Sequence, residues 1–151
     1  MGKTITIGAD HGGFKLKERI KVILKKTKYK IEDVGTYSDE ACDYPVFGFN
    51  AAKKVSQKKA EKGIVICKSG IGMSIIANKL PGVRAGVCAN VADAASSRKH
   101  NDTNVLVLSA SKLSGKKAEE IVKTWMKTSA LKGRHARRVK QIIAFEKQMF
   151  K

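Results

Sequence analysis

Short apolar runs and amphipathic stretches alternate along the whole chain. The short runs are rich in β-favouring residues, which is typical of buried strands. We expect strands at Thr4–Gly8, Lys30–Val34, Gly63–Cys67, Val83–Ala89 and Asn104–Leu108. Strands that alternate with helices in a single chain favour a parallel sheet whose two faces are both covered.

The segments between the strands carry apolar residues at the spacing of one helix face. The first such face consists of Leu16, Ile20, Ile23 and Leu24. Further helices are expected at Tyr44–Lys59, directly after Cys67, at Val91–Lys99, at Lys116–Lys127 and at about 135–150. No linker rich in proline, glycine or serine divides these elements, so residues 1–151 are predicted to form one domain. The predicted fold is a single-domain α/β, Rossmann-like three-layer sandwich with a five-stranded parallel sheet.

The most informative motif is the stretch Gly63–Lys79. A buried strand ends on Cys67, the chain breaks at Ser69-Gly70-x-Gly72, and a helix follows. This order places a thiol at the carboxyl end of a strand, next to backbone N–H groups that have no partner within the helix. A thiol beside such a group of amides is a reactive arrangement. A structural cysteine before a flexible turn would carry the same residues, so the motif alone leaves both interpretations open.

Length and composition restrict the class of protein. The chain has 151 residues, of which 42% are hydrophobic, enough for one domain with a core of its own. The three cysteines Cys42, Cys67 and Cys88 form no CxxC pair, so neither a disulfide framework nor a zinc site is expected. No apolar run reaches the roughly 18 residues of a membrane span, and no signal peptide is recognisable. We therefore expect a cytoplasmic protein without a membrane partner.

The net charge of +18 is the strongest deviation in composition. Nucleic-acid binding is one explanation, and a lysine-rich solvated surface is the other. The lysines are spread over the polar faces of several predicted helices, and no aromatic residues lie among them to stack on bases. Nucleic acid is therefore not expected to be the primary partner, whereas the positive field would attract small phosphorylated molecules.

Parallel α/β sheets bind their ligands at the carboxyl ends of the strands. Asp10 and His11 follow the first strand, and Tyr44 lies in the long connection after the second. Each histidine of the chain lies beside Asp, Asn or Arg, in a polar or glycine-flanked segment: His11, His100 and His135. One such histidine is more often a surface residue, but three in this setting favour a functional role.

The glycines of the central motif do not complete a nucleotide-binding pattern. Gly70-x-Gly72 begins a dinucleotide fingerprint, but Ile75 stands where its third glycine belongs. A Gly-Lys-Ser/Thr phosphate loop is also missing from the sequence. A nucleotide cofactor is therefore not expected, and the glycines are better explained as positions where backbone amides approach a small anion.

Five segments together resemble ribose-5-phosphate isomerase type B, in a wider family that includes the galactose-6-phosphate isomerase subunits. These segments are Gly8–Lys17, Asp43–Pro45, Cys67–Lys79, His100–Leu106 and Gly133–Arg138. The resemblance covers nearly the whole chain and implies an aldose–ketose isomerase that works through an enediolate. Such a reaction needs a base, an acid that opens the sugar ring, donors for the oxyanion and a phosphate clamp.

The resemblance also implies roles for individual residues. Cys67 would be the catalytic base, assisted by the N-terminus of the following helix. The amides of Ser69, Gly70, Ile71 and Gly72 would stabilise the enediolate, and the Ser69 hydroxyl would move protons between its two oxygens. His100 would protonate the ring oxygen as a catalytic acid.

The remaining implied residues bind the substrate. Asn101 would orient the sugar, and Asp10, His11, Tyr44 and Lys68 would line its binding site. Arg134 and Arg138, four residues apart and so on one helix face, would hold the phosphate.

The same resemblance implies a homodimer whose active site is shared between subunits, with no metal and no cofactor. The predicted last helix fits this expectation, because its stripe of Val139, Ile142 and Ile143 is unusually apolar for a chain end. We expect that helix to pack on a partner subunit.

Two positions depart from the family pattern. Lys68 stands where a glycine usually follows the cysteine, so it would add either strain, if the backbone there has positive φ, or positive charge. Ser111, followed by Lys112, stands where the family generally has a phosphate-binding arginine, and a lysine offers no bidentate fork.

Two alternative functions stay open at this point. The first is a hexose-6-phosphate isomerase of the same family, acting on allose or galactose 6-phosphate. The second is a basic protein that binds nucleic acid or a sugar phosphate without catalysis. Retention of Cys67, Ser69 and His100 together argues against the second alternative.

Overall fold

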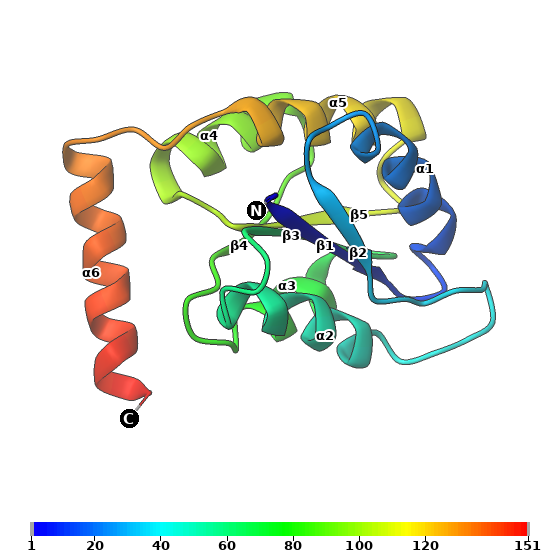
Figure 1. The fold of residues 1–151 in the computed structure, drawn as a ribbon, viewed down its shortest axis with the longest axis horizontal. Coiled ribbons are helices and arrows are strands. Elements are labelled where there is room, and N and C mark those ends of the chain that lie inside the picture. The colour runs from blue at the N-terminus through cyan, green and yellow to red at the C-terminus, as the bar shows by residue number, and fades with distance from the viewer. Residues whose placement is uncertain (1, 151) are drawn as a thin grey trace.

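The computed structural model describes residues 2–150. Five parallel strands form one sheet in the order β2-β1-β3-β5-β4 (Figure 1). The strands are β1 (Thr4–Ala9), β2 (Lys30–Asp33), β3 (Lys62–Cys67), β4 (Ala85–Val87) and β5 (Val105–Ser109). The predicted five-stranded parallel α/β sandwich is confirmed.

Helices cover both faces of this sheet, as its apolar strands require. They are α1 (Phe14–Leu24), α2 (Tyr44–Ser56), α3 (Ile71–Ala77), α4 (Val91–Asn101), α5 (Gly115–Lys127) and α6 (Arg134–Met149). Helices α1, α4 and α5 lie on one face, and α2 and α3 lie on the other (Figure 1). Along β3, Ile64 and Ile66 pack against the first group, whereas Val65 and Cys67 pack against the second. The side chain of Cys67 therefore points to the α2 and α3 face.

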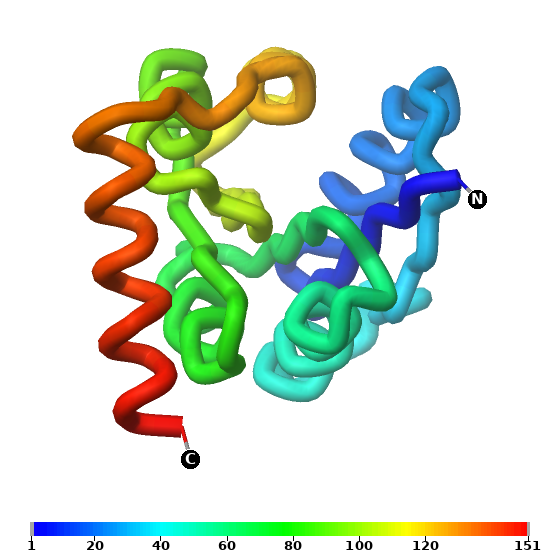
Figure 2. The backbone as a smooth tube through the Cα atoms, turned by 60° about the vertical axis from the view of Figure 1, so that its left-hand side comes forward, coloured from blue at the N-terminus to red at the C-terminus, as the bar shows by residue number. Residues whose placement is uncertain are grey.

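Helix α6 stands apart from these layers, beyond the β4 edge of the sheet (Figures 1 and 2). It contacts α4, and its Val139 is buried there. Near its far end the carboxylate of Glu146 accepts a hydrogen bond from the Gly82 N–H at 2.8 Å. Ile142, Phe145 and Met149 are exposed. The helix thus leaves an apolar stripe uncovered within the single chain.

The strand order creates a switch point between β1 and β3. From β1 the chain moves outward to β2, then crosses back to β3 on the other side of β1. Crevices at the carboxyl ends of two such strands are where open α/β sheets bind ligands. In this chain the residues at that place are the Asp10 turn and the Cys67 turn.

Several element boundaries differ from the sequence prediction by one to three residues. The fourth strand begins only at Ala85, because Val83 closes a turn onto the Leu80 carbonyl and the Arg84 N–H binds the side-chain oxygen of Asn104. Helix α2 ends at Ser56, three residues earlier than expected. Lys58 follows with φ of 58°, a left-handed conformation that cannot continue an α-helix.

Candidate active site

The Cys67 turn holds its thiol among backbone amides. Cys67 closes β3 and is only 4% exposed. Gly70 takes a left-handed conformation, with φ of 81°, that aims its N–H at the Cys67 Sγ, 3.2 Å away. The Ile71 N–H donates to the Ser69 Oγ at 3.2 Å, so the hydroxyl hydrogen of Ser69 can point elsewhere.

The peptide after Cys67 is fixed by the end of β5. The Ala110 N–H donates to the Cys67 carbonyl at 2.9 Å, and the Ser111 N–H donates to the Lys68 carbonyl at 3.0 Å. The hydroxyls of Ser109 and Ser111 donate to that same Lys68 carbonyl at 2.8 and 2.7 Å. Three donors on one oxygen hold the turn in place. Sequence reasoning missed this role of the two serines, because nothing in the pattern showed where their hydroxyls point.

Asp10 lies against the Cys67 turn. Its N–H donates to the Ile66 carbonyl at 3.3 Å, and its Oδ1 accepts from the Gly13 N–H at 3.1 Å. A Cβ at Gly13 would lie 2.6 Å from the Ile66 carbonyl oxygen, so only glycine permits this approach. A Cβ at Gly12 would touch both Asp10 and Lys68. The structure therefore brings together Asp10, in the turn after β1, and Lys68, in the turn after β3.

His11 is exposed, but its ring is oriented by the connection after β2. The Cys42 N–H donates to its Nδ1 at 3.1 Å. Because Nδ1 accepts, the neutral ring carries its proton on Nε2. His11 can therefore offer one N–H to a ligand at this edge.

Tyr44 begins α2 and lies on the first turn of α3. A Cβ at Gly72 would come within 2.6 Å of the Tyr44 ring. The glycine thus makes room for an aromatic wall beside the Cys67 turn. In this way the carboxyl edge of the sheet gathers Asp10, Tyr44 and the Ser69–Gly72 amides around Cys67.

Of the other two thiols, Cys88 is buried and Cys42 is half-buried. Burial raises the pKa of the Cys88 thiol, and a bond to the Ser97 hydroxyl offsets this only in part. Cys88 therefore stays protonated and unreactive near neutral pH.

The other predicted residues form a second group at the opposite edge. His100 and Asn101 end α4, which runs back from the carboxyl ends of the strands, and both side chains are exposed. The rings of His100 and His135 stack with centroids 4.3 Å apart. Arg134 and Arg138 lie on the first turns of α6 next to this stack and are exposed. Within residues 2–150 neither arginine takes part in an ion pair.

Partial desolvation and the positive charges of His100, Arg134 and Arg138 lower the pKa of His135 below its ordinary value. A lowered pKa keeps the ring neutral at pH 7. The cluster thus leaves His135 uncharged beside two arginines.

One chain cannot bring its two groups together. Strand β5 runs beside β3 in register from Val105 opposite Gly63 to Ser109 opposite Cys67. His100 precedes the start of β5, and Cys67 lies level with its end. Four residue steps of strand separate those levels by about 13 Å. The thiol and the imidazole therefore lie at opposite ends of the strands, the thiol at the carboxyl edge of the sheet and the imidazole at its amino edge.

Comparison with known proteins assigns the chain to a family. The sequence model described as Ribose/Galactose Isomerase matches residues 5–142. The chain belongs to the ribose/galactose isomerase family.

Relatives in this isomerase family are similar over nearly their whole length. Ribose-5-phosphate isomerase B of Escherichia coli is 40% identical over 146 residues, which are 97% of this chain and 98% of that one. The structure of the Clostridium thermocellum ribose-5-phosphate isomerase B matches with a TM-score of 0.93 and 46% identity, over 97% of this chain and 99% of that one. A Mycoplasma genitalium ribose-5-phosphate isomerase B structure with bound ribulose-5-phosphate matches with a TM-score of 0.93 and 38% identity, over 97% and 98%.

The structure explains how Lys68 and Ser111, the two departures from the isomerase family pattern, are accommodated. Among the described non-glycine residues only Lys58 and Asp102 have positive φ, so Lys68 is not strained. Its side chain is exposed beside the Cys67 turn and adds positive charge there. Ser111 anchors the Lys68 carbonyl instead of offering a cation to phosphate.

Within residues 2–150 no helix is long and apolar enough to cross a membrane. In the same range no three His, Cys, Asp or Glu side chains are grouped so that they could hold a metal ion.

Proposed function

We propose that this protein interconverts ribose 5-phosphate and ribulose 5-phosphate through an enediolate, as in the non-oxidative pentose phosphate pathway. The observation that carries the proposal is the Cys67 Sγ, which accepts the Gly70 N–H at 3.2 Å beside Asp10. The names of the relatives in Escherichia coli and Clostridium thermocellum support the substrate. A metabolic role of this kind also agrees with a cytoplasmic location.

Cys67 acts as the base in this mechanism. Its thiolate takes the proton from C2 of the open-chain aldose, and the C–H electron pair forms the C1–C2 double bond of the enediolate. The proton then returns to C1, while O2 gives up its own proton and becomes the ketone oxygen. The N–H groups of the Ser69–Gly72 turn stabilise the negative oxygen, and the Ser69 hydroxyl carries a proton between O1 and O2.

His100 opens the ring before this step. Ribose 5-phosphate is mainly a closed furanose, whose ring oxygen must gain a proton while the C1 hydroxyl releases one and C1 becomes an aldehyde. His100 ends a helix and is exposed, and an imidazole can donate a proton to a sugar oxygen, which suits this acid role. Asn101 orients the sugar, and Asp10, His11, Tyr44 and Lys68 line its binding site.

Arg134 and Arg138 hold the phosphate. They are one helical turn apart, exposed, and lie beside His100 through the stacked His135 ring. Two guanidinium forks on one helix face suit a phosphate dianion. Neither a metal nor a cofactor takes part in the proposed steps.

We further infer that the active site is completed by a second copy of the chain in a homodimer. Cys67 and His100 lie at opposite edges of one sheet, so a substrate about 8 Å long cannot reach both within one subunit. The apolar stripe of Ile142 and Phe145 on α6 lacks a cover, as do Ile71 and Ile75 on α3. A two-fold arrangement would cover these surfaces and bring the α6 end of one subunit to the Cys67 turn of the other.

A single assay tests the proposed reaction. The protein is given ribose 5-phosphate, and formation of ribulose 5-phosphate is followed with allose and galactose 6-phosphates as comparators. We expect the highest kcat/KM with the pentose phosphate. A higher value with either hexose phosphate would reassign the substrate. No turnover with any of the three, together with tight nucleic-acid binding, would favour the non-catalytic alternative.

Mixed subunits test the shared site. Cys67→Ala and Arg138→Ala subunits are each nearly inactive alone, but a heterodimer of the two contains one intact site. Random exchange should restore about one quarter of the wild-type specific activity. Heterodimers that form but stay inactive would place both residues in the same subunit's site.

A further inference from the structure

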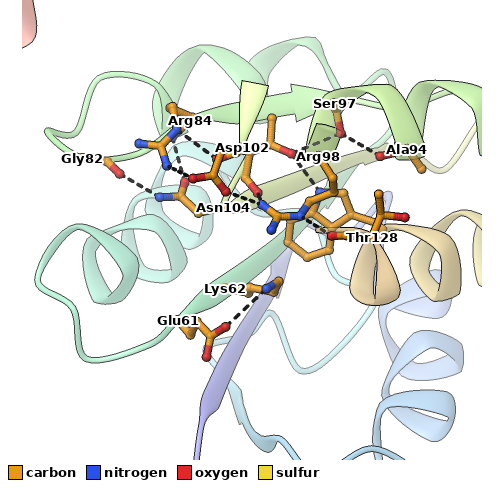
Figure 3. Close-up of polar contacts among 12 residues, drawn as sticks. Glu61, Lys62, Gly82, Arg84, Ala94, Ser97, Arg98, Asp102, Asn104 and Thr128 are labelled. Carbon is orange, nitrogen blue, oxygen red and sulfur yellow. Dashed lines mark hydrogen bonds and ion pairs between the residues drawn. The ribbon is translucent and has the colours of Figure 1, made fainter. Parts of the chain in front are cut away.

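The turn that follows His100 and Asn101 is held by two arginines. Figure 3 shows Asp102 between the guanidinium groups of Arg84 and Arg98. The Arg98 Nη1 donates to the Asp102 Oδ1 at 2.8 Å. From the other side, the Arg84 Nε donates to the Asp102 carbonyl at 2.9 Å, and its Nη2 lies 3.4 Å from the Oδ2. One aspartate is thus bound through its backbone and through both carboxylate oxygens.

Arg98 ties this turn to the core. Its side chain is only 10% exposed. The Nη1 also donates to the Thr103 carbonyl, and the Nε donates to the Thr128 carbonyl at 3.0 Å, just beyond α5. The Trp125 indole N–H, fully buried, donates to the Thr103 hydroxyl at 2.9 Å. The turn is therefore anchored to β5 and α5 through buried polar groups.

The backbone at Asp102 has an unusual conformation. Its φ is 46° and its ψ is 50°, in the left-handed region that non-glycine residues seldom occupy. This conformation ends α4 directly after Asn101 and turns the chain into β5. Arg84 and Arg98 bind Asp102, the residue at which the chain turns, so they fix the orientation of the end of α4.

His100 and Asn101 have few restraints of their own. Both side chains are exposed, and within the described residues neither makes a side-chain hydrogen bond. The stack on His135 is the one aromatic contact of the His100 ring in that part of the chain. Their placement therefore depends on the helix end, which the Arg98–Asp102 pair spans at a spacing of four residues.

We propose that Asp102, clamped by Arg98 and Arg84, is a positioning residue that aims the His100 imidazole at the sugar ring oxygen. The inference rests on the proposed function, because it assigns the ring-opening acid to His100. Its specific content is that loosening the clamp slows ring opening and leaves the enediolate step at Cys67 intact.

The Asp102→Gly variant removes the carboxylate without opposing the backbone. Glycine adopts positive φ at no steric cost, so the turn can still form. Lys58→Gly is the matched control, because Lys58 is the other described non-glycine residue with positive φ, at 58°, and lies after α2. Asp102→Asn is the conservative variant, since asparagine tolerates the left-handed region and keeps an oxygen acceptor for Arg98.

Two substrates separate ring opening from isomerisation. Ribose 5-phosphate must open its furanose, whereas erythrose 4-phosphate has its O4 esterified and cannot close one. We expect Asp102→Gly to lower kcat on ribose 5-phosphate about 10-fold, with KM changed less than about twofold. On erythrose 4-phosphate the kcat of Asp102→Gly should stay within about twofold of wild type. The kcat of Asp102→Asn and of Lys58→Gly should stay within the same limit on both substrates.

A spectroscopic measurement reports on His100 independently of turnover. In protein with labelled histidine, the His100 ring resonance is assigned by its loss in His100→Asn. We expect one sharp signal in wild type and Lys58→Gly, and a broadened or shifted signal in Asp102→Gly. An unchanged His100 signal in Asp102→Gly would overturn the inference even if the protein acted on another sugar phosphate.

The outcomes keep this inference apart from the proposed function. Wild-type protein that does not isomerise ribose 5-phosphate contradicts the proposed function, and the His100 signal then decides the positioning role. Active wild type with equal losses on both substrates in Asp102→Gly overturns the inference and makes the clamp purely structural. Unchanged activity on both substrates overturns it as well.

Discussion

The two edges of the sheet hold their functional groups in different ways. At the carboxyl edge, Cys67 and Asp10 are buried, and each is fixed by hydrogen bonds to neighbouring backbone. At the amino edge, His100, Arg134 and Arg138 are exposed on helix ends and lack such bonds within the described residues. The first edge is thus organised within one chain, whereas the second presents its groups outward.

This difference follows from the parallel topology. Strand ends and the amides of the following turns meet at the carboxyl edge, where a small site can form from backbone alone. The helices that connect the strands reach the amino edge with their carboxyl ends, which offer carbonyl groups rather than donors. Under the proposed function, these cations and this acid act on a substrate bound at the Cys67 turn of a second copy of the chain.

The largest expected effect comes from removing the thiol at the carboxyl edge. Cys67→Ala should lower kcat about 10²- to 10⁴-fold, the usual contribution of a positioned base. Sugar-phosphate affinity should change little, because the base acts on a C–H bond. Turnover and equilibrium binding measured on the same variant check this, and Cys88→Ala is the control. Near wild-type kcat in Cys67→Ala would remove the thiol from the mechanism.

The next effect concerns a buried ion pair beside the same edge. The fully buried Lys17 ammonium and Lys21 both contact the Asp33 carboxylate at the end of β2. Asp33→Asn leaves the Lys17 charge without its main partner and should lower the free energy of unfolding by about 3 kcal/mol. Urea denaturation measures this loss. Lys54→Gln, which breaks the half-buried pair with Glu32, is the control and should cost less than about 1 kcal/mol.

The same pair predicts a pH dependence. Burial acts to raise the pKa of Asp33, but hydrogen bonds from Lys17, Lys21 and the Gly35 N–H outweigh it and leave that pKa lowered. The contribution of Asp33 is therefore complete above the ordinary aspartate pKa of about 3.9 and is lost as pH falls through the folded-state value. Wild type should lose stability on acidification below about pH 4 more steeply than Asp33→Asn. Parallel curves for the two proteins would contradict this.

At the amino edge, His100→Asn should act on one substrate and not on the other. We expect kcat on ribose 5-phosphate to fall about 100-fold, and kcat on the ring-incapable erythrose 4-phosphate to fall less than about threefold. Steady-state kinetics with both sugars measures the ratio. Lys99→Gln changes a neighbouring charge on the same helix end and should leave the ratio unchanged. Equal losses in His100→Asn would mean that His100 does not open the ring.

The smallest expected effect is on the His135 stack. The pKa of His135 is lowered in the folded protein, so the unfolded chain binds the proton more readily. Its contribution is present above the ordinary histidine pKa of about 6.5 and is lost as pH falls below it. His135→Phe keeps the stacked ring without the charge, so its Tm should fall about 1 °C less than that of wild type between pH 7.5 and 5.5. Thermal melts at both pH values test this, and an identical fall would contradict it.

The sequence predicted the elements and the carboxyl edge well, for a physical reason. Alternating strand and helix periods determine a parallel sheet, and a glycine-rich turn after a strand determines where free amides point. The position of Cys67 follows from these local rules. The start of β4 does not follow from local rules, because the Arg84 N–H binds the side chain of Asn104, twenty residues later in the sequence.

Long-range polar contacts were beyond the sequence pattern. Lys17 looked like one more surface lysine, yet its side chain is completely buried against Asp33. The expected helix ended at Lys99, so neither the pair of Arg98 with Asp102 nor the burial of Arg98 beside the end of α5 was anticipated. Such contacts depend on how the helices pack on the sheet, and the spacing of apolar residues along the sequence does not determine this packing.

Because α6 stands apart from the sheet of its own chain, the proposed shared site makes activity depend on protein concentration. If each site needs the α6 end of another copy, the fraction of active sites follows the monomer–dimer equilibrium and falls on dilution. Specific activity would then depend on enzyme concentration even at saturating substrate. The phosphate would in turn bridge two subunits and favour their association, so substrate would protect the enzyme from dissociation as well as being consumed by it.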